Sequence, residues 1–152
     1  MGDVPGSPAD AVALERVTTI TQELVEAVKR LYPQLTDGAI PDADALARVV
    51  RGGETRLFVA RCDGAIVGMG TLVVYTVLTG TAAHVEDLVV DVRYRGRGIG
   101  ERLMRELMSQ GRAEGAGDIA LTSHPTREAA NRLYQRLGFE LGGTNYYSLD
   151  LG

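Results

Sequence analysis

Apolar residues recur along the chain with two different spacings, and the change from one to the other predicts the order of helices and strands. The segment AVALERV (11–17) predicts a short strand. In TQELVEAVKRLYPQL (21–35) four apolar residues share one helical face, and Pro33 is expected to end that helix. These four are Leu24, Val25, Val28 and Leu31. A second short helix is expected in PDADALARVVRGG (41–53), with its stop at Gly52–Gly53.

The middle of the chain changes to β-rich runs. Residues 55–78 hold two such runs around Asp63–Gly64, a dipeptide typical of tight hairpin turns. TAAHVEDLVVDV (81–92) predicts a further strand, and IGERLMRELMSQGRAEG (99–115) a helix whose apolar residues recur every four positions. DIALTSH (118–124) predicts the next strand.

The last third predicts one helix and a hairpin. TREAANRLYQRLGF (126–139) fits a helix with Thr126 as N-cap and Gly138 as its stop, after which Phe139 folds back. FELGGTNYYSLDL (139–151) is expected to form a β-hairpin. The resulting order, β-α-α-β-β-β-α-β-α-β-β, indicates one α/β domain over residues 10–152 with a mostly antiparallel sheet, preceded by a flexible tail over residues 1–9.

Composition narrows the class of protein. The chain has 152 residues, enough to bury a core without metals or disulfides, and a net charge of −4, which argues against a nucleic-acid binder. Cys62 is the single cysteine, so a reducing compartment is expected. Neither a long apolar run nor a signal-peptide pattern is present, so we expect a cytoplasmic protein with no membrane partner.

The segment RYRGRGIG (93–100) packs three arginines and three glycines between an expected strand and an expected helix. Backbone amides at a helix N-terminus lack internal partners, and glycines let a ligand approach them, so the pattern favours a phosphate or pyrophosphate site. A flexible loop with solvated arginines is the alternative. A P-loop needs Lys-Ser or Lys-Thr after its last glycine, whereas Glu101–Arg102 follow Gly100 here. The spacing also does not match a Rossmann fingerprint.

The motif in residues 95–100 and the segment EAANRLYQRLGF (128–139) resemble the GNAT superfamily of acetyl-CoA-dependent N-acetyltransferases. The resemblance extends from Val12 to Leu151, although Val92 stands where family members often have Pro. It implies the single-domain GNAT-like fold, a mixed and mostly antiparallel sheet flanked by helices. It also implies transfer of an acetyl group from acetyl-CoA to a primary amine by direct attack, without a metal.

The resemblance also implies roles for individual residues. The loop that would hold the coenzyme A pyrophosphate consists of Arg95, Gly96, Arg97, Gly98, Ile99 and Gly100. The pantetheine arm would pair with the backbone of Leu88, Val89 and Val90, and the Val90 amide would bind the thioester oxygen. Asn131 would contact pantetheine, and Tyr134 would protonate the leaving thiolate. On their own, Tyr134 also fits a core position and Asn131 an exposed helix position.

Acetylation of an amine also needs a base, because an amine with a pKa of about 10 is mostly protonated at neutral pH. Glu86 is our first candidate and Asp87 the second. In a regular strand they point to opposite faces and His84 shares the face of Glu86, although a bulge would exchange the acids. Solvated or ion-paired carboxylates are the alternative. His84 and His124 are too few to suggest a metal site.

Several alternatives stay open at this stage. The same fold could serve as a non-catalytic acyl-CoA-binding or regulatory module, use another donor such as succinyl-CoA or propionyl-CoA, or, more remotely, bind a nucleotide. The acceptor is expected to be a small-molecule or peptide amine. Asp37, Asp42 and Asp44 suggest a cationic acceptor or simply a helix N-terminus. Unpaired strand edges are compatible with a homodimer.

Overall fold

The computed structural model describes residues 12–152. The strands are β1 (Val12–Arg16), β2 (Thr55–Cys62), β3 (Ala65–Val77), β4 (Gly80–Val90) and β5 (Ile119–Ala120). The helices are α1 (Gln22–Leu35), α2 (Ala43–Arg51), α3 (Ile99–Ala113) and α4 (Glu128–Arg136), with a 3-10 turn, η1, at Val92–Tyr94. Contacts divide the chain into two units: one ends at Leu121 and the other is Thr122–Gly152. Each unit is described by itself.

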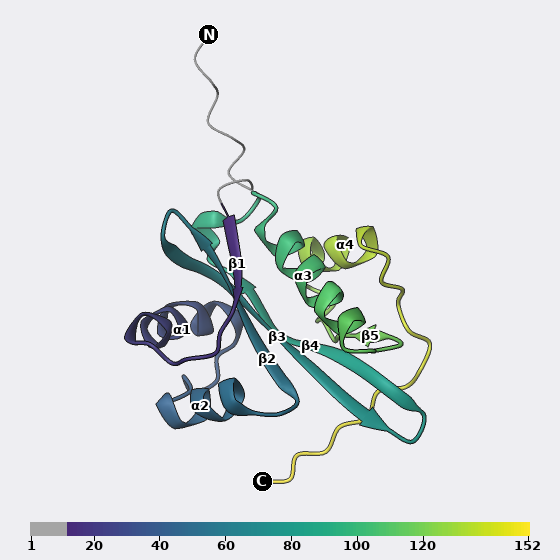
Figure 1. Ribbon diagram of the computed structural model, residues 1–152. Helices are drawn as coiled ribbons and strands as arrows, with labels where there is room; N and C mark the ends of the chain where they lie inside the picture. Colours follow the sequence, from purple (N-terminus) through teal and green to yellow (C-terminus); the bar gives the residue numbers. More distant parts are fainter. Residues whose placement is uncertain (1–11) are drawn as a thin grey trace. The chain divides into compact units, whose positions relative to one another are not determined.

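The first unit is a five-stranded sheet between two helical layers. Its strands follow chain order, β1-β2-β3-β4-β5; neighbours are antiparallel except for the parallel pair β4–β5, which α3 connects. Figure 1 shows α1 and α2 against one face and α3 against the other. The antiparallel start and the later crossover agree with the sequence prediction.

Two different kinds of packing hold the helices to this sheet. On the α1–α2 face the core consists of Leu24, Ala27, Val28, Leu31, Leu46, Leu57, Val59, Ile66, Met69 and Val89. On the α3 face, glycines of β3 let the helix approach closely: a Cβ on Gly68 would lie 3.1 Å from Leu103 Cδ1, and one on Gly70 would lie 3.2 Å from Leu107 Cδ1. Larger residues at these two positions would push α3 away from the sheet.

The early elements form where the apolar spacing predicts them, with one correction. Thr21 caps α1, and Asp42 caps α2 by accepting from the Ala45 amide at 2.8 Å. Pro33 does not end α1, which continues to Leu35. Proline in the last turn removes only its own hydrogen bond, and the Thr36 amide still donates to the Tyr32 carbonyl at 3.1 Å. The turn between β2 and β3 has positive φ at both Asp63 and Gly64, as predicted for a tight hairpin.

The second unit differs from the prediction at two places. Thr126 is not the cap of α4; its hydroxyl lies 2.7 Å from His124 Nδ1, and Arg127 holds the cap position without a side-chain bond. The predicted end of α4 is confirmed, because the Phe139 amide donates to the Tyr134 carbonyl and the Gly138 amide to the Gln135 carbonyl.

The hairpin predicted for residues 139–151 is absent from the described chain, where these residues form no regular strand. Leu141, Tyr146, Tyr147 and Leu149 are largely exposed. An isolated two-stranded hairpin has too little apolar burial to offset its ordering entropy, so turn chemistry at Gly142–Gly143 alone does not form it. β5 is likewise shorter than predicted, with two residues in place of seven.

Candidate functional site

The segment between β4 and α3 forms an open nest of backbone amides. Gly96 and Gly98 have φ values of 77° and 78°, a left-handed conformation that glycine adopts without strain. Gly98 is the N-cap of α3 and offers no side-chain hydrogen bond to the first turn. A Cβ on Gly96 would meet no atom within 4 Å. The helix N-terminus therefore presents amides with partial positive charge that an anionic ligand can reach.

A buried carboxylate fixes the entry to this nest. Asp91 is 1% exposed and its carboxylate accepts from the Arg93 amide at 3.1 Å and from Arg93 Nη2 at 3.0 Å. Arg30 of α1 lies 3.6 Å from the same carboxylate. The hydrogen bonds from Arg93 hold the pKa of Asp91 below its usual range, although burial opposes them. Asp91 and Arg30 were not among the residues predicted from the sequence; the available signal was an acidic residue directly after an apolar strand.

Two arginines of the nest are themselves held in place. Arg95 Nε donates to the Val90 carbonyl at 3.0 Å, and the Arg97 guanidinium lies 5.1 Å from the centre of the Tyr94 ring. Both residues are exposed. They place positive charge beside the amides while their side chains pack along the 3-10 turn and the end of β4.

The pairing of β4 with β5 ends at His84, before the chain reaches this nest. The two strands pair only at Ala83–Ile119 and His84–Ala120, so β4 beyond His84 has no partner on that side among the described residues. The Asp91 amide donates to the carbonyl of Val67 in β3 at 2.8 Å, so it points toward β3. Because backbone groups of successive strand residues point to opposite sides, the amide of Val90 points to the open edge. This edge can accept an extended ligand by backbone hydrogen bonds.

A β-bulge in β4 lies at the candidate acid Asp87. Met69 pairs with Val89 but Thr71 pairs with Glu86, so Gly70 alone opposes Asp87 and Leu88. Asp87 has a φ of 56°, unusual for a residue other than glycine. The regular alternation along β4 is therefore interrupted directly after Glu86, because the bulge adds one residue to this strand.

The surroundings of the two acids differ. Glu86 Oε1 lies 3.0 Å from His84 Nε2, as expected for residues on one side of the strand. Partial burial has the larger effect on the pKa of the Asp87 carboxyl group and raises it, whereas the influence of the Thr71 hydroxyl lowers it. Thr71 was not singled out from the sequence, and it is 4% exposed. Thr71 pairs with Glu86, and Met69, two residues before it on β3, belongs to the core beneath α1 and α2, so Glu86 lies on the α1–α2 face.

Asn131 and Tyr134 lie on α4 in the second unit. Asn131 Nδ2 donates to the His124 carbonyl at 3.1 Å and so ties the preceding loop to the helix. Tyr134 is buried, and its ring meets that of Phe139 edge-on at 6.1 Å. Burial raises the pKa of the Tyr134 phenol, with Arg127 acting in the opposite direction. That Asn131 and Tyr134 contact the acetyl donor stays a prediction.

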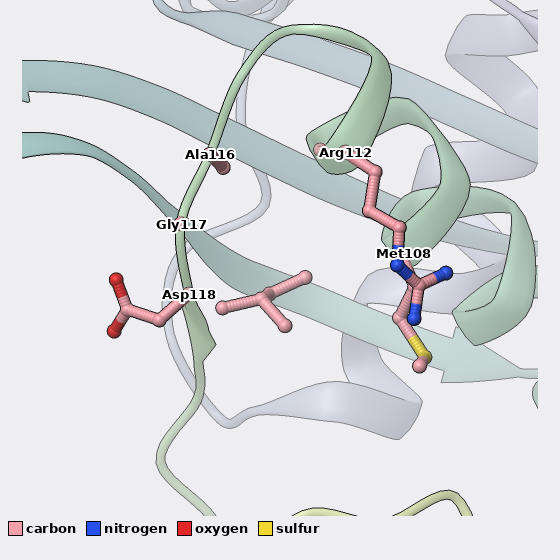
Figure 2. A pocket seen from close by; sticks show the side chains of 7 residues that line it. Met108, Arg112, Ala116, Gly117 and Asp118 are labelled. Atoms are coloured by element: carbon pink, nitrogen blue, oxygen red, sulfur yellow. The ribbon is translucent and has the colours of Figure 1, made fainter.

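Other features of the described chain lie away from these residues. Figure 2 shows a pocket at the C-terminal end of α3, lined by Met108, Arg112, Ala116, Gly117 and Asp118 among others. It contains none of the predicted site residues. Residues 12–152 hold no group of three His, Cys, Asp or Glu side chains arranged to bind a metal. No helix in that range is long and apolar enough to cross a membrane.

Comparisons with known proteins agree on one family. The chain is 36% identical over 88 residues to glucosamine 6-phosphate N-acetyltransferase from Trypanosoma brucei brucei, which covers 56% of this chain and 58% of that protein. The chain thus spans little more than half the length of that relative. A solved Trypanosoma brucei acetyltransferase has 27% identity and a TM-score of 0.74, covering 92% of this chain and 99% of the other.

A second solved structure supports the fold. An aminoglycoside acetyltransferase from an uncultured soil metagenomic sample has 20% identity and a TM-score of 0.80, covering 93% of this chain and 99% of the other. The model of the acetyltransferase (GNAT) family matches residues 18–139, which include the amide nest, the bulged strand and α4. The fold, the glycine-rich helix N-terminus and these matches agree: the chain belongs to the GNAT acetyltransferase family.

Proposed function

We propose that this chain transfers the acetyl group of acetyl-CoA to a primary amine by direct attack. The observation that carries the proposal is the uncapped N-terminus of α3, with left-handed Gly96 and Gly98, directly after a strand whose edge is open. The residues present fit the donor, because coenzyme A carries a pyrophosphate followed by an extended pantetheine arm that contains amide groups. The family assignment and the named acetyltransferase relatives support the same reaction.

The donor would bind along a continuous path on the first unit. The backbone amides of residues 95–100 would hold the pyrophosphate, with charge from Arg95 and Arg97 beside them. The pantetheine arm would pair with the open edge at Leu88, Val89 and Val90. Arg95 already occupies the Val90 carbonyl, which leaves the amide of the same residue for the thioester oxygen. Asn131 is proposed as a further contact to pantetheine.

The reaction needs one base and one acid. The amine nitrogen attacks the thioester carbonyl, a C–N bond forms, and the C–S bond breaks with its electron pair leaving on sulfur. The ammonium form of the amine first gives one proton to the base, and the attacking nitrogen loses a second proton to solvent once the C–N bond has formed. The thiolate takes one proton from the acid, so the products are an N-acetyl amide and free coenzyme A, with one proton released overall. No covalent intermediate with the enzyme is required, and Cys62 is buried.

For the base we favour Asp87 over Glu86. Both acids lie at the surface, and Glu86 is engaged by His84 at 3.0 Å. Asp87 stands in the bulge, and partial desolvation raises the pKa of its carboxyl group, which makes it a better proton acceptor. The sequence alone ranked these two acids in the opposite order; Glu86 remains the alternative base.

Tyr134 is the proposed acid. Because burial raises the pKa of its phenol, the group stays protonated at neutral pH and can donate to the thiolate. We expect Tyr134→Phe to lower kcat by about 100-fold, the lower end of general acid–base effects, while acetyl-CoA affinity changes little. Steady-state kinetics and calorimetric titration of acetyl-CoA check this; unchanged kcat would remove the acid role.

A donor and acceptor screen tests the function as a whole. Release of the coenzyme A thiol is followed with acetyl-, propionyl- and succinyl-CoA against amino sugars, aminoglycosides, polyamines, lysine peptides and peptide N-termini, and each product is identified by mass. Transfer from acetyl-CoA to at least one amine is expected. Tight acetyl-CoA binding without transfer to any amine would favour the non-catalytic acyl-CoA-binding module. Faster transfer from propionyl- or succinyl-CoA would show that the protein transfers that acyl group instead of acetyl.

We further propose that the protein is cytoplasmic and forms a homodimer. The free, buried thiol of Cys62 fits a reducing compartment. Among the described residues, the outer edge of β1 has no strand partner and provides unpaired backbone groups. The mass in solution, measured by light scattering, checks the dimer. Asp42 already caps α2, which leaves Asp37 and Asp44 as the acidic residues that could attract a cationic amine.

A further inference from the structure

The turn between β4 and the amide nest is bonded to a side chain from α1. The Val92 amide donates to Gln34 Oε1 at 2.8 Å. Gln34 Nε2 donates in turn to the Arg30 carbonyl at 3.2 Å, so both ends of the side-chain amide are used and its orientation is fixed. Val92 stands where members of the family often have proline, which has no N–H to donate. The contact therefore depends on a residue by which this chain departs from the family pattern.

A second contact from α1 reaches the residue before Val92. Arg30 lies one turn before Gln34 on the same side of the helix. Its guanidinium donates to the Ile66 carbonyl of β3, and Arg30 Nε lies 3.6 Å from Asp91 Oδ2. Asp91 is 1% exposed and caps the 3-10 turn η1. Two consecutive residues at the end of β4 are thus bound from α1.

The nest that follows does not determine its own conformation. Gly96 and Gly98 both have positive φ, and a Cβ on Gly96 would meet no atom within 4 Å. Glycine has the widest choice of backbone conformations, so the segment does not by itself favour the one in which the amides converge. Its far end is fixed, because Ile99 of α3 is 1% exposed. The near end is the turn at Val92, which α1 holds.

The geometry points to Gln34 as a positioning residue that holds the turn at Val92 and thereby keeps the amide nest in its binding conformation. Gln34 contacts the turn and not the ligand, and Arg95, the first residue of the nest, follows Val92 by three positions. The inference rests on the proposed binding of acetyl-CoA and gives α1 a part in it. Without the bond the turn is free to move, and the ligand must then order the nest as it binds.

The first test removes the acceptor while keeping the length of the side chain. We expect Gln34→Met to weaken acetyl-CoA binding about fivefold in a calorimetric titration, as for the loss of one hydrogen bond. The KM for acetyl-CoA should rise by a similar factor, with kcat within twofold. Free coenzyme A should lose the same factor, since it shares the pyrophosphate that the nest would hold. A loss confined to acetyl-CoA, or a fall in kcat alone, would overturn the inference.

Gln22→Met is the matched control. Gln22 is the first residue of the same helix, and its Nε2 donates to Glu26 Oε1 at 2.9 Å, also near the surface. The control removes a glutamine hydrogen bond at the other end of α1 and should keep the wild-type affinity. An unchanged affinity in Gln34→Met, or an equal loss in the two variants, would contradict the role of Gln34.

A double-mutant comparison separates positioning from a general effect on stability. Val92→Pro removes the amide that Gln34 binds, and Asp91, with φ −51° and ψ 131°, has a conformation that a following proline allows. Proline also suits the first position of a helical turn. If Gln34 acts through the Val92 amide, Gln34→Met should cause its fivefold loss in the wild type and less than a twofold loss in Val92→Pro. An equal loss in both backgrounds would show that Gln34 acts elsewhere.

Amide hydrogen exchange followed by NMR tests the contact without a ligand. The Val92 amide should exchange about fivefold faster in Gln34→Met than in the wild type, whereas the Asp91 amide, bound to the Val67 carbonyl, serves as the reference and should not change. An unchanged rate at Val92 would contradict the contact. Thermal unfolding of each variant identifies any that fails to fold, and Gln34→Ala then replaces Gln34→Met.

The outcomes also separate this inference from the proposed function. A wild type that binds no acetyl-CoA removes both. A wild type that binds acetyl-CoA but acetylates no amine removes the proposed reaction, while the fivefold loss in Gln34→Met would still support the positioning of the nest. A wild type that binds and transfers, with equal affinity in Gln34→Met, removes only the role of Gln34.

Discussion

The backbone groups at the two ends of α3 differ in whether they have hydrogen-bond partners. At the C-terminal end, the Gly115 and Ala116 amides donate to the Arg112 and Gly111 carbonyls, which closes the helix with its own backbone. At the N-terminal end, Gly98 supplies no side-chain cap. A protein that leaves one helix end without a cap while closing the other keeps the first available to a ligand, since unsatisfied amides otherwise reduce stability.

The ion pairs near the two ends of α3 also differ. Arg56 Nε lies 3.0 and 2.9 Å from the two carboxylate oxygens of Glu114, which also accepts from Gln110 at 2.8 Å. At the opposite end, Glu101 lies 3.3 Å from Arg105, and their side chains are 35% and 63% exposed. The C-terminal end thus fastens α3 to β2, whereas the ion pair of Glu101 with Arg105 lies within α3 itself and is more exposed.

The largest expected effect comes from filling the nest. Gly98→Val places a branched side chain at a φ of 78°, where it strains the backbone and covers the amides. We expect acetyl-CoA affinity to fall about 100-fold, equivalent to about 2.8 kcal/mol, in a calorimetric titration.

Gly115→Val is the matched control for Gly98→Val, because Gly115 has a similar φ of 86° at the other end of the helix. It should lower stability but leave acetyl-CoA affinity unchanged. Equal loss of affinity in both variants would show that strain, not the open nest, governs binding.

A smaller effect is expected on stability at the fastened end. Glu114→Gln removes a charge-assisted, bidentate contact to Arg56, and we expect the free energy of unfolding to fall by about 2 kcal/mol in urea titrations at pH 7. Glu101→Gln, at the exposed end, should cost about 0.5 kcal/mol or less. If the two losses were equal, the comparison of the two ends would fail.

The same variant predicts a pH dependence. Hydrogen bonding to Arg56 lowers the pKa of Glu114 in the folded state, so its contribution to stability is present above the unfolded pKa of about 4.3 and is lost as pH falls through the folded value. The difference in the free energy of unfolding between the wild type and Glu114→Gln should therefore become smaller in acid. A difference that stays constant down to pH 3 would contradict this assignment of the Glu114 contact.

Removal of a single charge near the nest should weaken binding less than filling the nest does. Arg97→Ala should weaken acetyl-CoA binding about fivefold, near 1 kcal/mol, and make binding less sensitive to salt, since an exposed charge at a helix terminus contributes little. Arg112→Ala, which removes a positive charge at the other end of α3, is the control and should change neither quantity. The titrations are run at low and high salt.

The sequence predicted those features of the structure that depend on only a few adjacent residues. Asp63–Gly64 marks the hairpin turn, Gly98–Ile99 the start of α3 and Gly138 the end of α4, because left-handed turns and helix ends depend on a few adjacent residues. The segment 139–151 has equally clear turn chemistry but forms no hairpin, since a strand needs a partner that local sequence does not supply.

The sequence by itself determined the order of elements, the family resemblance and the glycine-rich nest at the start of α3, all of which follow from local spacing and backbone freedom. The tertiary structure decided how the strand that carries the two candidate acids is bent. Register between β3 and β4 creates the bulge at Asp87, which takes a φ of 56°. The bulge arises only because the two strands pair out of register by one residue, and no periodicity within either strand reports that pairing.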